Sequence, residues 1–311
     1  MDLSAINPIL LIASIMISAT PILLAAIGEM VVERAGVLNL GVEGMMITGA
    51  VVGFAVAVGS GAPLLGFAAG ALAAAALALG FGVLTQYLLS NQVATGLGLT
   101  LVGLGLSSLI GKPYEGIKAP SLPRLDLGPL SDLPVVGRML FSHDIMVYVS
   151  LVLVAAVWAF LTYTRAGLIL RAVGESHDAA HALGYKVVRV RLLAILFGGA
   201  CAGLGGAYLS LVRVPQWTEG ITAGSGWIAL AIVVFASWRA GRVALGAYLF
   251  GGISVLQLNL QAAGAQVPVA LLSASPYLIT ILVLVVISAR GAKTGAHGAP
   301  ACLGRPFHAS S

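Results

Sequence analysis

The sequence predicts an all-α, polytopic transmembrane bundle of about nine spans, within a range of eight to ten. Hydrophobic residues make up 59% of its 311 residues and charged residues only 9%, whereas soluble domains carry charges on about a quarter of their residues. The mean hydropathy is +1.03. Apolar runs of about 20 residues, the length that crosses a bilayer as a helix, recur along the whole chain. They are unbroken rather than alternating, which favours helices over barrel strands.

The spans follow from the apolar runs and the polar breaks between them. We expect them at about 6–28, 37–59, 62–89, 92–111, 143–163, 191–212, 226–238, 243–262 and 271–289. The segments near Glu43 and Trp227 are candidates for broken or re-entrant helices. Residues 1–290 are therefore predicted to form one transmembrane domain.

Basic residues set the predicted orientation, because cytoplasmic loops are enriched in Lys and Arg. A cytoplasmic loop at 164–190 places most of these residues inside and the N-terminus outside. The segment 112–142 has five prolines and is predicted to be an irregular extracytoplasmic loop. The loop 164–190 lacks proline and favours a short surface helix. The Gly/Ala/Pro-rich tail 291–311 is predicted to be a disordered cytoplasmic segment.

Known enzyme motifs are missing from the sequence. It has no phosphate-binding loop, no nucleophile elbow, no CxxC pair and no HExxH. His177 and His181 share the i,i+4 spacing of zinc ligands, but no third ligand is evident and a solvated helix is favoured. We therefore expect no catalytic residues, no metal, no cofactor and no nucleic-acid binding, with any ATP hydrolysis residing in a separate chain.

The stretch ERAGVLNLGVEGMM, from Glu33 to Met46, concentrates polar residues in a very apolar chain. Glu29, Glu33 and Arg34 are expected at the cytoplasmic edge of the first span, as a loop or surface group. Glu43 lies within the next apolar run, where a charge costs at least ~2.5 kcal/mol and needs a partner. Two roles stay open for Glu43, a structural hydrogen-bonding role and a role in a transport path or gate.

A second polar cluster, SNQVATGLGLTL, opens the fourth span at Ser90. Asn91 fits a helix cap, and threonines can bond their own helix backbone, so polarity alone is weak support for a path. The predicted translocation path combines both clusters: Asn39, Glu43, Asn91, Gln92 and Thr95.

The sequence resembles the permease subunits of ATP-binding cassette (ABC) importers for branched-chain amino acids, simple sugars and nucleosides. Five blocks carry the resemblance in order: 28–50, 91–107, 165–194, 198–211 and 224–239. The blocks ERAGVLNLGVEGMM and NQVATGL are most similar to the nucleoside or simple-sugar branch. The resemblance implies a multi-pass protein of a prokaryotic plasma (inner) membrane. It also implies three kinds of partner: cytoplasmic ATP-binding subunits, a second permease subunit and an extracytoplasmic solute-binding protein.

Within the inner loop, Asp178-Ala179-Ala180 followed by Gly184 matches the spacing of the acidic-Ala-Ala-x-x-x-Gly pattern by which importer permeases dock on an ATPase. Asp178 stands where glutamate is common in that pattern. The predicted ATPase-coupling residues are Arg171, Gly174, Glu175, Asp178, Ala179, Ala180, Gly184 and Tyr185. Candidates for contact with the binding protein are Arg213, Trp217 and Glu219, in an outer loop.

Three alternatives remain open from the sequence. An ion-coupled secondary transporter would use Glu43 as its proton or sodium site. An importer in the same family could carry branched-chain amino acids instead of nucleosides or sugars. A non-transporting membrane scaffold or receptor is disfavoured, because the sequence contains no soluble sensory or catalytic domain.

Overall fold

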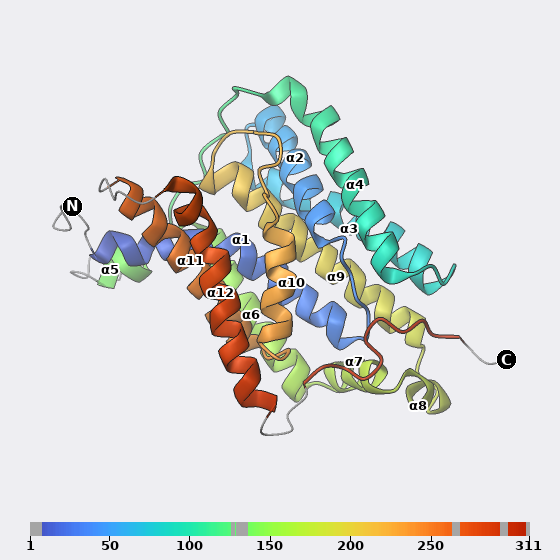
Figure 1. Cartoon of the computed structure of the whole chain (residues 1–311). Coiled ribbons are helices and arrows are strands. Elements are labelled where there is room, and N and C mark those ends of the chain that lie inside the picture. Colours follow the sequence, from blue (N-terminus) through green and yellow to red (C-terminus); the bar gives the residue numbers. More distant parts are fainter. Residues whose placement is uncertain (1–7, 126–127, 129–135, 263–267, 293–297, 309–311) are drawn as a thin grey trace.

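The computed structural model describes residues 8–125, 128, 136–262, 268–292 and 298–308. Over these ranges the chain is helical, and strand pairing is limited to three isolated bridges. Figure 1 shows α1 (Pro8–Arg34) and α9 (Val187–Tyr208) passing through the bundle. α4 (Gln92–Gly111) lies along one side, and α11 (Ala240–Ala262) and α12 (Val269–Ala292) along the other. The all-α prediction is confirmed.

The remaining elements complete the bundle and its loops. They are α2 (Val42–Ser60), α3 (Pro63–Gln86), the 3₁₀ turn η2 (Lys112–Tyr114), α5 (Val136–Leu140), α6 (Ile145–Tyr163), α7 (Arg165–Glu175), α8 (His177–Ala182), the π-helical turn η4 (Leu209–Arg213) and α10 (Ser225–Phe235). Each predicted span coincides with one of these helices or with α1, α4, α9, α11 or α12.

The span count of about nine is approximate. Seven of the described helices are long and apolar enough to cross a membrane. α10 has 11 residues and therefore extends only about 16 Å at 1.5 Å per residue, about half of a hydrocarbon core. The suspected broken helix near Trp227 is thus a half-length helix. α12 occupies the position of the ninth predicted span.

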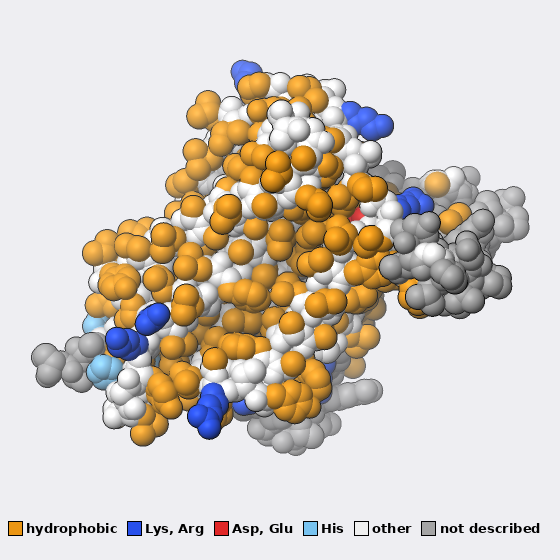
Figure 2. Space-filling view, turned by 180° about the vertical axis from the view of Figure 1, so that it is seen from behind, with side chains coloured by type: hydrophobic (Ala, Val, Ile, Leu, Met, Phe, Trp, Pro, Cys, Tyr) orange, Lys and Arg blue, Asp and Glu red, His pale blue; other side chains and the backbone are white. Residues whose placement is uncertain are grey.

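The surface agrees with a bilayer as solvent. In the face drawn in Figure 2, apolar side chains cover most of the molecule, and Lys and Arg side chains lie toward its margins. Leu72, Leu101, Leu109 and Val152 are all at least two-thirds exposed. Lipid is the environment in which such side chains need no protein partner.

Glycine and alanine allow the central helices to pack closely. α9 packs against α1, α2 and α3. A Cβ added at Gly203 would collide with the Gly70 carbonyl oxygen, and one added at Gly206 would collide with the Met46 carbonyl oxygen. Small residues are what permits such approach where no hydrophobic effect drives helices together. This close packing holds α1 and α2 against the C-terminal part of α9.

The C-terminal tail differs from the predicted disordered segment over the residues that the structure describes, 298–308. Its backbone bonds to the inner loop and to the connection between α1 and α2: Cys302 N–H donates to Gly174 O at 2.9 Å and Gly304 N–H to Gly36 O at 3.1 Å. The ring of Phe307 is buried between His177 and His181, at centroid distances of 5.4 and 5.3 Å. Residues 293–297 and 309–311 lie outside the described part.

The docked tail gives a prediction for the inner loop. Phe307→Ala removes the aromatic ring that α8 packs on, so we expect hydrogen–deuterium exchange to become faster in peptides covering 174–186. The effect is local, because Phe307 contacts the loop rather than the transmembrane core. The exposed neighbour His308 provides the control, and His308→Ala should leave exchange unchanged. Equal exchange in all three proteins would contradict a packing role for the tail.

Candidate translocation path and coupling surface

Glu43 is the N-terminal anchor of the half-length helix α10. Its Oε1 accepts hydrogen bonds from Thr222 Oγ1 at 2.6 Å and from Gly224 N–H at 2.9 Å, and its Oε2 accepts one from Gly226 N–H at 2.7 Å. The first N–H groups of a helix have no partner within that helix and carry partial positive charge. A carboxylate there satisfies the donors and is itself stabilised.

Glycine is required at the contact between the two helices. An added Cβ at Gly226 would lie 2.6 Å from the backbone of Glu43, so the start of α10 rests directly on the first turn of α2. Gly224 has φ +83°, a left-handed conformation that glycine adopts without strain. The local sequence T-A-G-S-G therefore both turns the chain and lets it reach the carboxylate.

The other end of α10 is anchored just as firmly. Ser237 and Trp238 both adopt positive φ, 52° and 54°, which is uncommon for residues with side chains. Arg34 donates from Nε and Nη2 to the Trp238 carbonyl, at 3.2 and 3.0 Å. The Trp238 indole N–H donates to Glu33 Oε2 at 2.5 Å. These bonds to α1 hold the turn between α10 and α11.

These contacts correct the expected surface position of Glu29 and Glu33, whereas Arg34 is the last residue of α1 and partly exposed. α1 continues to Arg34, beyond the predicted end of the first span near residue 28. Glu29 and Glu33 are 1% and 0% exposed, so they are not surface groups. Both carboxylate oxygens of Glu29 lack a hydrogen-bond partner among the described residues. The polar motif belongs to the interior of the bundle, where it ties α1 to the turn after α10.

A mixed polar and apolar cavity of about 330 Å³ opens beside the N-terminus of α10. Its polar side chains come from Thr222, Ser225, Ser254, Gln257, Tyr277 and Arg213, and Phe250 is among its apolar ones. Ser254 and Gln257 lie three residues apart on α11, inside a strongly apolar run. That i,i+3 pair was the available sequence signal, and sequence reasoning missed it.

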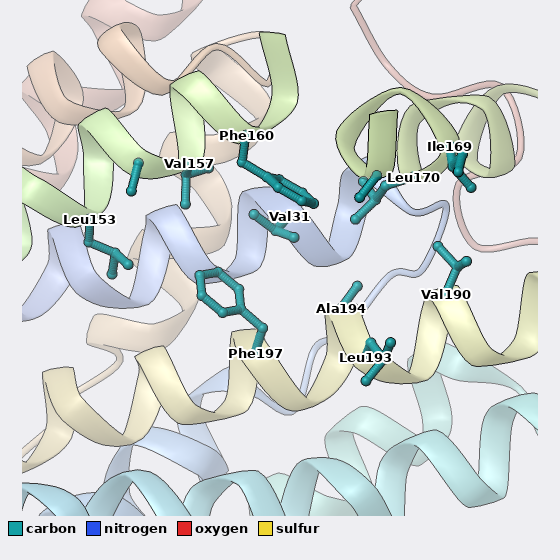
Figure 3. Close-up of a pocket in the computed structure, with 12 residues that line it drawn as sticks. Val31, Leu153, Val157, Phe160, Ile169, Leu170, Val190, Leu193, Ala194 and Phe197 are labelled. Carbon is teal, nitrogen blue, oxygen red and sulfur yellow. The ribbon is translucent and has the colours of Figure 1, made fainter. Parts of the chain in front are cut away.

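A second cavity is of a different kind. Figure 3 shows side chains of α1, α6, α7 and α9 around a space of about 420 Å³. Val31, Phe160, Leu170 and Phe197 are representative of its lining, which is entirely apolar. A polar solute would have to give up its hydration there without replacement, at a cost of roughly 2–7 kcal/mol per buried polar group. The cavity beside α10 is therefore the better candidate for a path.

The predicted path residues divide between two places. Asn39 and Gln92 both bond to the backbone of the segment before α2: Asn39 Oδ1 accepts from Gly41 N–H at 3.0 Å, and Gln92 Oε1, at the start of α4, accepts from Leu38 N–H at 2.8 Å. Asn91 caps α4 by accepting from Ala94 N–H, and Thr95 pairs with Ser90. Among the hydrogen bonds of the described residues, Glu43 alone of the five is bonded to α10, through Gly226 N–H.

The predicted coupling residues lie on α7, α8 and the turn that follows. Glu175, Asp178, Ala179, Gly184 and Tyr185 are exposed, whereas Gly174 and Ala180 are buried. Ser176 caps α8 through Ala179 N–H, and Gly184 ends the turn with φ +85°. Arg171 is partly buried at the end of α7. The exposed members all lie between residues 175 and 185.

The two histidines considered as zinc ligands, His177 and His181, also lie here, and both rings pack against Phe307. Burial and the nearby Arg191 guanidinium lower the pKa of His177, which disfavours the protonated form of its ring. Its Nδ1 lies 3.3 Å from Arg191 Nη2, and its ring packs on Phe307. Within the described ranges, no group of three or more His, Cys, Asp or Glu side chains is placed to hold a metal ion.

The three outer-loop candidates have separate environments. Trp217 is 2% exposed, with its indole packed on Gly111. Arg213 donates to Ser18 O at 3.0 Å. Glu219 is exposed and accepts a bond from Ser108. Burial leaves Trp217 unable to touch a partner, whereas Glu219 is free to reach one.

Comparison with known proteins agrees with this architecture. Residues 11–288 match the family model for the branched-chain amino acid transport system / permease component. The putative glucose ABC transporter permease protein TsgC13 of Haloferax volcanii is 42% identical over 289 residues, covering 86% of this chain and 88% of its own. The guanosine ABC transporter permease protein NupQ of Bacillus subtilis is 31% identical, covering 98% of this chain and 100% of its own. The nucleoside ABC transporter permease protein NupC of Lactococcus lactis is 30% identical, covering 88% and 91%. No solved structure matches the chain.

The match covers nearly all of the helical bundle. The family works with ATP-binding subunits and a solute-binding protein, and its members are permease subunits rather than enzymes. Seven apolar helices fit a multi-pass protein of the inner membrane. The chain belongs to the branched-chain amino acid transport system / permease component family and is a permease subunit of an ABC transporter.

Proposed function

We propose that this chain forms half of the translocation path of an importer, paired with a second permease subunit, for a nucleoside or simple sugar. An extracytoplasmic binding protein delivers the solute, and cytoplasmic ATPases switch access. The N-terminus lies outside, and the inner loop at 164–190 faces the cytoplasm with the basic residues around it.

One observation carries this proposal: a half-length helix begins at a buried carboxylate and borders a polar cavity. Irregular backbone at membrane depth is tolerated where it is buried or lines a cavity. Discontinuous helices that end near the midplane are typical of transport sites. Two of the predicted residues, Asn39 and Gln92, remain candidates only as supports of the segment before α2, and Asn91 and Thr95 only as supports of the start of α4. Glu43 supports the cavity wall directly, through its bond from Thr222.

The chemistry of the cavity favours an uncharged polar solute over an amino acid. Hydroxyl and amide groups of Thr222, Ser225, Ser254 and Gln257 line it together with Tyr277, and Arg213 is its one charged residue among those described. A zwitterionic amino acid calls for a carboxylate opposite its ammonium group. The names of the guanosine, nucleoside and glucose relatives point the same way.

We assign the coupling surface to Glu175, Asp178, Ala179, Gly184 and Tyr185, the exposed members of the predicted set. The other predicted coupling residues support this surface from below: Arg171, Gly174 and Ala180. Gly174 packs on the Arg34 carbonyl, and Ala180 is part of a small core with Val173 and Phe307. For the binding protein, Glu219 is the proposed contact, with Arg213 and Trp217 shaping the loop behind it.

Ala179→Arg tests the coupling assignment. Ala179 is exposed, so the substitution should leave the permease folded while its bulk and charge block entry into an ATPase cleft. We expect the ATP-binding subunit to co-purify with the parent chain from native membranes and to be lost from the variant. Ala299→Arg, an equally exposed alanine outside α8, is the matched control and should retain the ATPase. Co-purification with Ala179→Arg would refute the assignment.

A further inference from the structure

Four arginines surround one cavity at the inner ends of α1, α6 and α7 and the start of α11. The cavity has a volume of about 440 Å³ and is lined by Arg34, Arg171, Arg239 and Arg242, together with Trp158, Leu161, Thr162, Trp238, Ala240 and Gly241. Its lining contains no acidic side chain among the described residues. Nothing in the coupling or transport proposals uses these charges.

The positive charge of this cavity is poorly balanced from within the protein. In the described part of the chain, the one close pairing of a basic with an acidic side chain is that of His177 with Asp178, at 3.5 Å, and it involves none of the four arginines. Arg34 feels repulsion from both Arg171 and Arg239, and Glu175 is the acidic group that attracts it. Glu33, the other nearby carboxylate, is buried and bonded to the Trp238 indole. Arg171 Nε is buried and finds no hydrogen-bond partner among the residues that the structure describes.

The surroundings place this charge at a membrane boundary. Trp158 and Tyr163 on α6 are 51% and 72% exposed and stack edge to face at 5.3 Å, as aromatic side chains do at the headgroup level. α11 begins at Ala240 in the cavity wall, so the positive end of its dipole adds to the arginines. Both features favour an anion at the level of lipid headgroups.

An apolar groove adjoins the arginine cavity and shares Arg242 with it. The groove has a volume of about 570 Å³ and runs between α10, α11 and α12, lined chiefly by Ile232, Phe235, Leu245, Leu249 and Val283. A ligand that fills both spaces must carry an anionic head and an apolar chain. A free phosphate or a soluble nucleotide would leave the groove without an occupant.

We propose that this cavity and groove bind one anionic phospholipid of the cytoplasmic leaflet, with its phosphate among Arg34, Arg171, Arg239 and Arg242 and an acyl chain in the groove. The lipid neutralises like charges that would otherwise repel one another at the turn after α10. It thereby stabilises the contact between Arg34 and the Trp238 carbonyl. The inference rests on the proposed orientation, in which residues 164–190 face the cytoplasm, but it needs neither the solute nor the ATPase to be identified.

Thermal unfolding of the full-length chain in mild detergent tests the proposal. We expect phosphatidylglycerol to raise the unfolding midpoint saturably, whereas phosphatidylcholine of the same chain length and sodium phosphate do not. A basic residue near a lipid surface contributes about 1 kcal/mol, so each arginine removed should raise the half-saturating lipid concentration about fivefold. Arg239→Gln/Arg242→Gln should therefore require roughly 25-fold more lipid.

Two further variants keep the result interpretable. Arg242→Gln alone changes an exposed side chain and serves if the double variant does not fold. Arg189→Gln removes an equally exposed arginine on α9, outside the cavity, and should bind phosphatidylglycerol like the parent. Equal shifts with phosphatidylcholine, a full shift with phosphate alone, or unchanged affinity in Arg242→Gln would each overturn the proposal.

Discussion

Glu43→Ala is expected to reduce solute uptake by at least about tenfold while leaving the chain in the membrane. The substitution removes all three hydrogen bonds that hold the start of α10, and bonds to a charged group contribute about 1.5–3 kcal/mol each. The N–H groups of Gly224 and Gly226 would then be left unpaired in the interior. The measurement is uptake of radiolabelled guanosine and glucose by cells that express the whole transporter.

Graded variants separate anchoring from proton chemistry. Thr222→Val removes one donor of the three and should lower uptake less than Glu43→Ala. Glu43→Gln keeps the size of the side chain but points an amide N–H group at a backbone N–H, so it should fall near Glu43→Ala. An uncoupler should leave uptake intact while ATP is maintained. Full activity of Glu43→Ala would refute the anchoring role, and collapse of parental uptake with the uncoupler would restore the ion-coupled alternative.

The positions of the helices could be predicted from composition, because each span needs a long apolar run whatever its neighbours. The polar motif around Glu43 could be recognised as unusual because charged residues are rare within long apolar runs. Its partner could not be identified, since Thr222, Gly224 and Gly226 are 179 to 183 positions away. Their contribution is largely backbone N–H groups, which every non-proline residue carries, so no side-chain pattern pointed to them.

Contacts between distant positions also explain why the burial of Glu33 and the docking of the tail could not be predicted from the sequence. The first span was predicted to end near residue 28 because charge normally marks a helix end, yet Glu33 stays inside by bonding to Trp238, 205 positions away. The tail composition indicated disorder, yet the described residues 298–308 dock mainly through backbone bonds to Gly174 and Gly36 and through the single ring of Phe307. Amino-acid composition cannot predict either kind of contact.

The structure also distinguishes glycines that pack tightly against a neighbouring helix from glycines that do not, which the sequence alone cannot do. Gly206 on α9 faces the backbone of α2, and an added Cβ would overlap the Met46 carbonyl oxygen and lie 3.0 Å from Ala50 N. Gly105 on α4 has open space where its Cβ would go. Both residues lie in apolar, glycine-rich runs, and the sequence alone does not distinguish them.

Gly206→Ala is therefore expected to lower the free energy of unfolding by about 3 kcal/mol, at the upper end of the usual range for overpacked cores. The clash is with backbone atoms, which a rotamer change cannot relieve, so α2 and α9 must separate and disturb the first turn that carries Glu43. Gly105→Ala should leave stability unchanged or raise it by up to about 1 kcal/mol, because alanine favours the helix. The measurement is the unfolding midpoint and yield of each purified variant. Equal behaviour of the two would mean that α2 and α9 do not approach as closely as the structure places them.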